Sequence, residues 1–144
     1  MIERDTVRLL RECDAGVQMG AAAISDVLAK VQQPGLRRAL TECRDKHEQL
    51  GRQIRTALGN FHDKGKSPNP AVLAMSRAKT GLRLAVHKSD AAIADLMTDG
   101  CSMGVKSLNH YLNRYKAADE RSKDMAKRLI NLEQKLAEDI RAFL

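Results

Sequence analysis

Apolar residues recur at three- and four-residue steps along most of this chain, which is the spacing of amphipathic α-helices. A first helix is expected over residues 3–31, before Gln33-Pro34-Gly35 interrupts the pattern. A second apolar stripe then continues to Phe61. Because the connection is so short, the two helices should be antiparallel neighbours, forming one helical hairpin over residues 3–62.

The second half of the chain repeats this layout after a break. Residues 63–88 form a connector, in which a loop rich in Gly and Pro, expected to be mobile over 63–69, precedes a short helix over 71–86. That helix should lie across the bundle, rather than join it as a fifth member, and should rest on it through Val72, Met75, Leu82 and Val86. Ser89 is a suitable N-cap for the next long helix, and residues 117–119 form the turn before the last helix. A second hairpin is therefore expected over residues 89–144.

The two hairpins also resemble each other in sequence. Met19-Gly20 and Met103-Gly104 are 84 residues apart, and Leu50 and Leu136 are related by an offset of 86. Two hairpins joined by a long crossover are typical of ferritin-like bundles. The predicted fold is therefore all-α: one domain, residues 1–144, forming a ferritin-like four-helix bundle of two repeated hairpins with a short crossover helix.

A family resemblance agrees with this layout. The segment SDAAIADLMTDGCSMG, together with the short amphipathic helix before it, resembles a group of bacterial ferritin-like proteins known only as a domain of unknown function. The resemblance extends over almost the whole chain and rests on layout and loose patterns. It implies a four-helix bundle of the ferritin type, and it implies no established activity.

Composition and the first residues of the chain indicate the make-up of the core and the cellular location. Aromatic residues make up only 3% of the 144 residues, so the core should consist of Leu, Ala, Val, Ile and Met. No apolar run approaches the roughly 20 residues that cross a bilayer, so no transmembrane segment is expected. The start, MIERDTVRLL, lacks the apolar stretch of a signal peptide, which predicts a cytoplasmic location. Cys13, Cys43 and Cys101 are expected to be buried, reduced thiols.

The net charge of +7 is concentrated in the connector. Six basic residues and no acidic residue lie between Lys64 and Lys88. Two explanations of these basic residues are open. They belong either to a solvated loop and surface helix or to a surface that binds an anionic partner (acidic protein, nucleic acid or lipid headgroups). The candidate residues for that surface are Arg77, Lys79, Arg83 and Lys88. Because the segment has no aromatic residue to stack on bases, base recognition is not expected.

A ferritin-like di-iron site requires a Glu from each of two helices and a Glu-x-x-His from each of the other two. This chain departs from that pattern, because the last helix has no histidine and the third has Asp but no Glu. The candidate ligands for iron, zinc or manganese are Glu12, Glu42, His47 and Cys101. Cys43 and His47 are spaced to chelate one metal, and the repeat offset predicts His47, Cys101 and Glu133 in one core layer. A buried thiol beside a hydrogen-bonded histidine is the alternative explanation of the same residues.

Two functions remain open at this point. The first is a non-enzymatic scaffold or interaction module without a cofactor, forming a homo-oligomer such as a dimer, since Leu9, Leu73 and Leu84 lie outside the main stripes. The second is a metal-binding or oxidative-stress protein with a degenerate metal site. No nucleophile elbow, phosphate loop or Cys-x-x-Cys indicates an enzyme. The glycine pairs Gly16/Gly20 and Gly100/Gly104 should let the first and third long helices approach closely.

Overall fold

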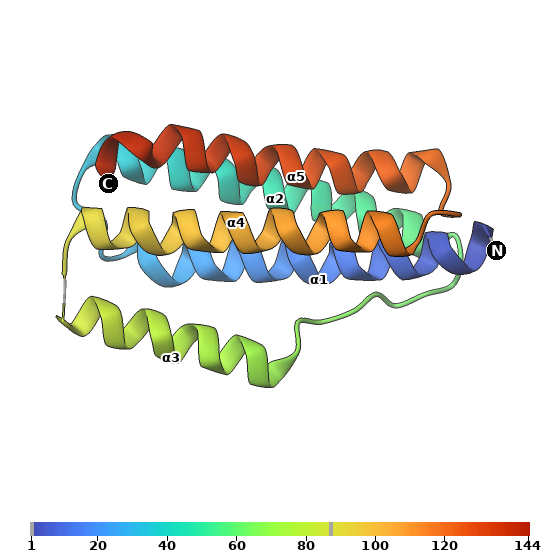
Figure 1. Ribbon diagram of the computed structural model, residues 1–144, viewed down its shortest axis with the longest axis horizontal. Coiled ribbons are helices and arrows are strands. Elements are labelled where there is room, and N and C mark those ends of the chain that lie inside the picture. The colour runs from blue at the N-terminus through green and yellow to red at the C-terminus, as the bar shows by residue number, and fades with distance from the viewer. Residues whose placement is uncertain (1, 87) are drawn as a thin grey trace.

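The computed structural model describes residues 2–86 and 88–144, which form five α-helices, a terminal 3-10 turn and no strand (Figure 1). The helices are α1 (Ile2–Leu28), α2 (Pro34–Gly59), α3 (Pro70–Val86), α4 (Asp90–Arg114) and α5 (Glu120–Ile140), followed by the 3-10 turn Arg141–Phe143. The all-α prediction is confirmed at this level. Within the same residues, no helix combines the length and apolar character needed to span a membrane.

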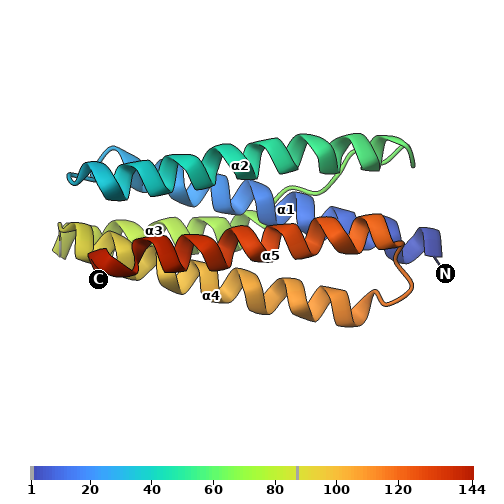
Figure 2. The same cartoon turned by 90° about the horizontal axis from the view of Figure 1, so that it is seen from above.

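Four long helices, α1, α2, α4 and α5, lie side by side, and α3 lies outside them (Figures 1 and 2). The loop after α2 and α3 itself lead the chain back along the molecule, so α4 begins beside the α1–α2 turn. Hydrogen bonds fix this end, because the Asp90 carboxylate accepts from the backbone N–H groups of Gln32 (3.0 Å) and Gln33 (2.8 Å). At the opposite end, Thr6 Oγ1 accepts from the N–H of Asp119 at 2.8 Å.

The helix starts follow the local signals in the sequence. Ser89 caps α4 by accepting from the N–H of Ala92, and Asp119 caps α5 in the same way from Ser122. Pro34 is the first residue of α2, where its missing N–H costs nothing. These predicted boundaries are confirmed, whereas α1 ends at Leu28, three residues earlier than expected.

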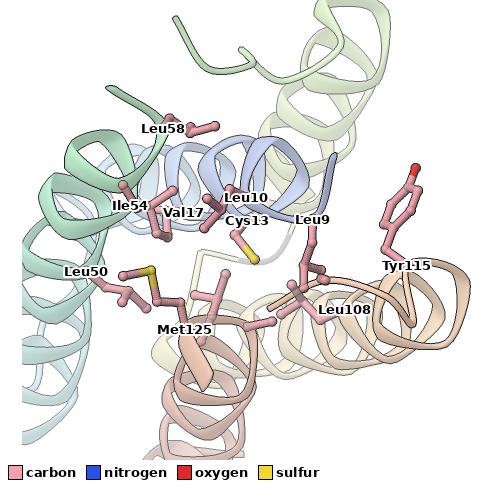
Figure 3. Packing of buried hydrophobic residues seen from close by; sticks show 14 of the residues in the cluster. Leu9, Leu10, Cys13, Val17, Leu50, Ile54, Leu58, Leu108, Tyr115 and Met125 are labelled. Carbon is pink, nitrogen blue, oxygen red and sulfur yellow. The ribbon is translucent and has the colours of Figure 1, made fainter. Parts of the chain in front are cut away.

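The apolar core consists of two clusters, one toward each end of the long helices. Figure 3 shows the first, in which Leu10, Cys13 and Val17 of α1 face Met125 of α5 and Ile54 of α2. The second cluster has these buried members: Ile24, Val27, Val31, Leu36, Leu40, Cys43, Leu84, Ala92, Ile93, Leu96, Met97, Cys101, Leu136 and Ile140. The three cysteines are buried free thiols, as expected.

The loop before α3 is held against α1 by polar contacts. Lys66 donates from its backbone N–H to Asp14 (3.0 Å) and from Nζ to Glu12 (2.6 Å), and its carbonyl accepts from Gln18. Gly65 has a φ of 87°, a conformation that L side chains rarely adopt. We expected a mobile loop over 63–69 because it has little apolar surface to pack against the helices. These hydrogen bonds attach the loop to α1, which the sequence pattern did not reveal.

The predicted anchors of α3 are wrong for three of the four residues. Val72, Met75 and Leu82 are 53%, 73% and 71% exposed, and the side chain of Val86 lies outside the described part of the chain. Leu84, at 2% exposure, is the side chain through which α3 enters the core, and it joins the second cluster. The helix is therefore turned so that the expected apolar row faces outward. It also lies lengthwise beside α1 and α4 rather than across them (Figures 1 and 2).

Candidate functional site

A polar layer lies between the two apolar clusters. His47 is carried on the inward face of α2, where the spacing from Cys43 and to Leu50 keeps all three side chains buried. Its side chain is only 1% exposed. Glu133 reaches the same point from α5 and is 12% exposed. The predicted meeting of His47 and Glu133 is confirmed.

Both nitrogens of the His47 ring have partners. Nδ1 lies 2.8 Å from the carbonyl oxygen of Cys43 and 3.4 Å from the Cys43 thiol. Nε2 lies 2.8 Å from Oε1 of Glu133. A carbonyl can only accept, so Nδ1 carries a proton. When Nε2 is also protonated, the ring donates to the Glu133 carboxylate, which makes a charge-assisted bond.

The charges in this layer favour the protonated imidazolium. Burial alone lowers the pKa of His47, but the hydrogen bonds and charges of Cys43 and Glu133 outweigh burial and raise this pKa to about 10. Burial, followed by the charge of Glu133 and a hydrogen bond to it, raises the pKa of Cys101 well above its ordinary value. Cys101 is therefore a neutral thiol and not a reactive thiolate, and it lies beside the ion pair of His47 and Glu133.

Two glycines make room for the pair. A Cβ atom at Gly20 would lie 2.7 Å from Nε2 of His47, and one at Gly104 would lie 3.4 Å from the Glu133 carboxyl carbon. At Gly100 a Cβ would meet nothing within 4 Å, and at Gly16 only a methyl of Leu129 at 3.5 Å. The expectation that these glycines bring two helices together is therefore wrong. Gly20 and Gly104 accommodate side chains from α2 and α5.

The four proposed metal ligands are not brought together. His47 and Cys101 both lie at the polar layer, but Glu12 is paired with Lys66 near the loop, and Glu42 is exposed on the outer side of α2. Among the described residues, no group of three or more His, Cys, Asp or Glu side chains is arranged to hold a metal ion. Glu133 was missing from our ligand set, although the repeat offset had already assigned it to this layer.

A second feature is the outward face of α3. Val72, Met75, Lys79 and Leu82 follow one another at three- and four-residue steps, so they share one helix face. We name these four residues the outer row. All four are exposed, and the three apolar members are among the most exposed large apolar side chains of the described chain. Exposed apolar side chains that share one helix face in this way are a common mark of an interaction site.

The basic residues proposed for an anionic partner divide into two pairs. Arg77 binds Asp26 of α1 at 3.1 Å, and Arg83 binds Asp95 of α4. These two arginines hold α3 to the bundle, a role that the sequence pattern did not reveal. Lys79 and Lys88 are exposed, and neither has an ion-pair partner within residues 2–86 and 88–144.

In comparisons with known proteins, no protein-family model, curated protein or solved structure matches this chain.

Proposed function

We propose that this chain is a non-enzymatic interaction module, in which a helical bundle presents α3 to a partner. The observation that carries the proposal is the outer row, whose apolar members are 53% to 73% exposed although α3 has a second, buried side. Burying these three side chains at an interface would contribute about 1–2 kcal/mol each. That sum is enough to support binding of moderate affinity.

The way α3 is attached supports the same function. Its own contacts with the bundle include the buried Leu84 and two ion pairs whose members are 36% to 52% exposed. Ion pairs this exposed contribute little, typically below about 1 kcal/mol each. The buried Leu84 is therefore the stronger of these contacts, and none of them uses the outward face, which stays accessible to a partner.

Self-association remains a prediction, but its original reason no longer applies. Leu9 and Leu84 are buried within their own chain and Leu73 is half-buried, so they offer little apolar surface to a second copy. Light scattering during size-exclusion chromatography tests it directly. A dimer mass would support a homo-oligomer, and a monomer mass at the highest soluble concentration would contradict it.

Photo-crosslinking at a single position tests the interaction module. A photoactivatable residue replaces Met75 in the outer row or, as a matched control, Met103 on α4, which is 69% exposed against 73% for Met75. Irradiation of cells that produce the chain should give a defined adduct from position 75 and none from position 103. Equal adducts from both positions, or none from position 75, would contradict the proposal.

The finer description of the fold belongs to the same proposal. A ferritin-like topology is supported by the crossover, which starts after α2 and returns the chain to the α1–α2 turn, where Asp90 binds Gln33. It is also supported by the equal offset of Leu50 from Leu136 and of His47 from Glu133. In this view the module is a ferritin-like bundle with an ion pair at the polar layer.

Metal binding is a second candidate function, favoured by one observation. Nδ1 of His47 is bonded to a backbone carbonyl, as in many metal sites, and its Nε2 faces Glu133 beside the Cys101 thiol. Zinc accepts imidazole, carboxylate and thiolate ligands. Binding would require the His47–Glu133 bond to open and Cys101 to lose its proton.

Cobalt(II) titration distinguishes this candidate from the module. A site that includes Cys101 should give intense sulfur-to-cobalt absorption, which a Cys101→Ser variant loses and a Cys13→Ser variant keeps. Cys13 is an equally buried thiol in the other cluster. Elemental analysis of dialysed protein, purified without a metal-affinity tag, gives the second readout. Protein free of metal, with no sulfur-to-cobalt band, would eliminate the metal function.

A further inference from the structure

The outer row contains a cation among its apolar side chains. Lys79 lies four residues after Met75 and three before Leu82, so it shares their face of α3. Its side chain is exposed and has no ion-pair partner within the described residues. A partner that covers this row must bury apolar surface and also receive an ammonium group at its centre.

The connector that carries the row has further unpaired cations. Lys64 and Lys88, near the two ends of the connector, are exposed and have no ion-pair partner in the part of the chain that the structure describes. The charges of Arg77 and Arg83 are balanced by Asp26 and Asp95. The segment from Lys64 to Lys88 contains no acidic residue, so its uncompensated charge is positive.

These charges argue against a second copy as the occupant. If the outer row packed against the outer row of another chain, Lys79 would face an identical, unpaired cation in a partly desolvated interface. Like charges placed together in this way oppose association. The row therefore requires a partner of opposite charge.

The shape of the surface favours a flat occupant. α3 is the outermost element on its side of the molecule and runs lengthwise along it (Figure 1). The outer row therefore forms a convex ridge parallel to the long helices, and one plane can touch all four side chains. At a bilayer, apolar side chains enter the acyl boundary while a lysine extends its ammonium group to the headgroup phosphates.

We propose that the outer row docks the protein on an anionic lipid surface, with Val72, Met75 and Leu82 entering the bilayer interface and Lys79 binding lipid phosphates. This inference rests on the proposed interaction module and names its partner. Polybasic attraction to anionic headgroups supplies the electrostatic part and weakens with salt. The docked α3 lies on the membrane and does not cross it.

Co-sedimentation with vesicles tests this docking. The wild type should bind vesicles of equimolar phosphatidylglycerol and phosphatidylcholine, and it should bind phosphatidylcholine vesicles far more weakly. Met75→Asp should weaken binding about tenfold or more, because one apolar anchor becomes an anion. Lys79→Ala should weaken it about fivefold, and the effect should disappear near about 0.5 M salt. Met103→Asp is the control, since it adds the same charge at an equally exposed methionine on another helix, and it should bind at least half as tightly as wild type.

A label gives a second readout that does not depend on a destabilised variant. The three native thiols are buried, so a cysteine introduced as Leu82→Cys, or as Met103→Cys for control, can be labelled selectively with a polarity-sensitive fluorophore. Phosphatidylglycerol vesicles should shift the emission of the label at position 82 to the blue and leave the label at position 103 unchanged.

The outcomes separate this inference from the proposed function. No binding of the wild type to anionic vesicles, equal binding to neutral ones, or equal losses from Met75→Asp and Met103→Asp would each overturn the lipid surface. If a photo-adduct at position 75 is nevertheless a protein, the interaction module stands with an acidic protein as its partner. If neither an adduct nor vesicle binding is found, both proposals fail.

Discussion

Replacing Gly20 with alanine should destabilise the protein, although the same change at Gly100 should stabilise it. Both glycines lie within helices, where alanine is the better helix former. A Cβ at Gly20 would lie 2.7 Å from Nε2 and 2.8 Å from Cδ2 of His47, and 3.4 Å from Oε1 of Glu133. Real Cβ atoms essentially never show contacts below 3.0 Å. The His47 ring must therefore move.

The magnitude follows from three opposing contributions. Alanine gains about 1 kcal/mol in helix propensity at either position. At Gly20, overpacking costs about 1–3 kcal/mol. The ring cannot retreat freely, because Nδ1 is bonded to the carbonyl of Cys43. Displacement also weakens the bond to Glu133, and complete loss of such a buried pair would cost about 3–5 kcal/mol. We expect Gly20→Ala to lose about 1–3 kcal/mol net, and Gly100→Ala to gain about 0.5–1 kcal/mol.

Urea denaturation followed by circular dichroism measures these differences. Gly16→Ala provides an intermediate case, since its Cβ would make only an ordinary 3.5 Å contact with Leu129. The expected order of the free energy of unfolding is Gly100→Ala, then Gly16→Ala, then wild type, then Gly20→Ala. If Gly20→Ala proves as stable as Gly100→Ala, the glycine does not make room for His47, and our account of the polar layer is wrong.

Three further predictions concern the polar layer and α3. Folding raises the pKa of His47 from 6.5 to about 10, so the stabilisation by its protonated form is complete below pH 6.5 and is lost as pH rises through about 10. The free energy of unfolding should fall by about 3–5 kcal/mol over that range. This fall should exceed any change in a His47→Leu/Glu133→Leu double variant. Glu133→Leu alone should cost about 3–5 kcal/mol because it leaves a buried imidazolium unpaired, and the double variant should recover most of this loss in the same urea assay; a double variant no more stable than the single one would contradict this. Leu84→Asp should remove hydrogen-exchange protection from α3 alone, whereas Leu82→Asp should leave it intact; the opposite result would mean that α3 docks through its expected face.

Local chemistry made the helix boundaries predictable. Ser89 and Pro34 act within one turn of their own position, through a cap bond and a fixed backbone angle. Apolar spacing likewise identified most of the buried residues of the long helices, with Leu9 of α1 as an exception outside its stripe. These signals need no knowledge of what packs against the helix.

The docked face of α3 was not predictable by the same means. This helix has apolar residues on both sides, so Val72, Met75 and Leu82 formed the more regular stripe while Leu84 was the residue actually buried. The choice between the two sides depends on tertiary partners, including the ion pair of Arg77 with Asp26, which is 51 residues away. Periodicity within one helix carries no information about such partners.

The ligand set failed for a related reason. Glu12 and Glu42 were chosen by residue type, but a carboxylate on a helix serves a site only if its face points there. Glu12 instead binds Lys66 in the loop, and Glu42 is exposed. The repeat offset was the better guide, because it compares equivalent positions of two hairpins and so includes helix phase. It placed Glu133 opposite His47, where the structure has it.

The corresponding positions of His47 and Glu133 explain why the polar layer contains opposite charges. His47 and Glu133 occupy matching positions of the two hairpins, 86 residues apart, and each lies against a glycine of the matching pair Gly20 and Gly104. Two identical hairpins would place two histidines or two glutamates at this point, and like charges in a buried layer repel. Because the halves differ here, the layer instead holds a cation and an anion that satisfy each other. The ion pair therefore favours pairing of a first hairpin with a second one, and it penalises pairing of two copies of the same hairpin from different chains.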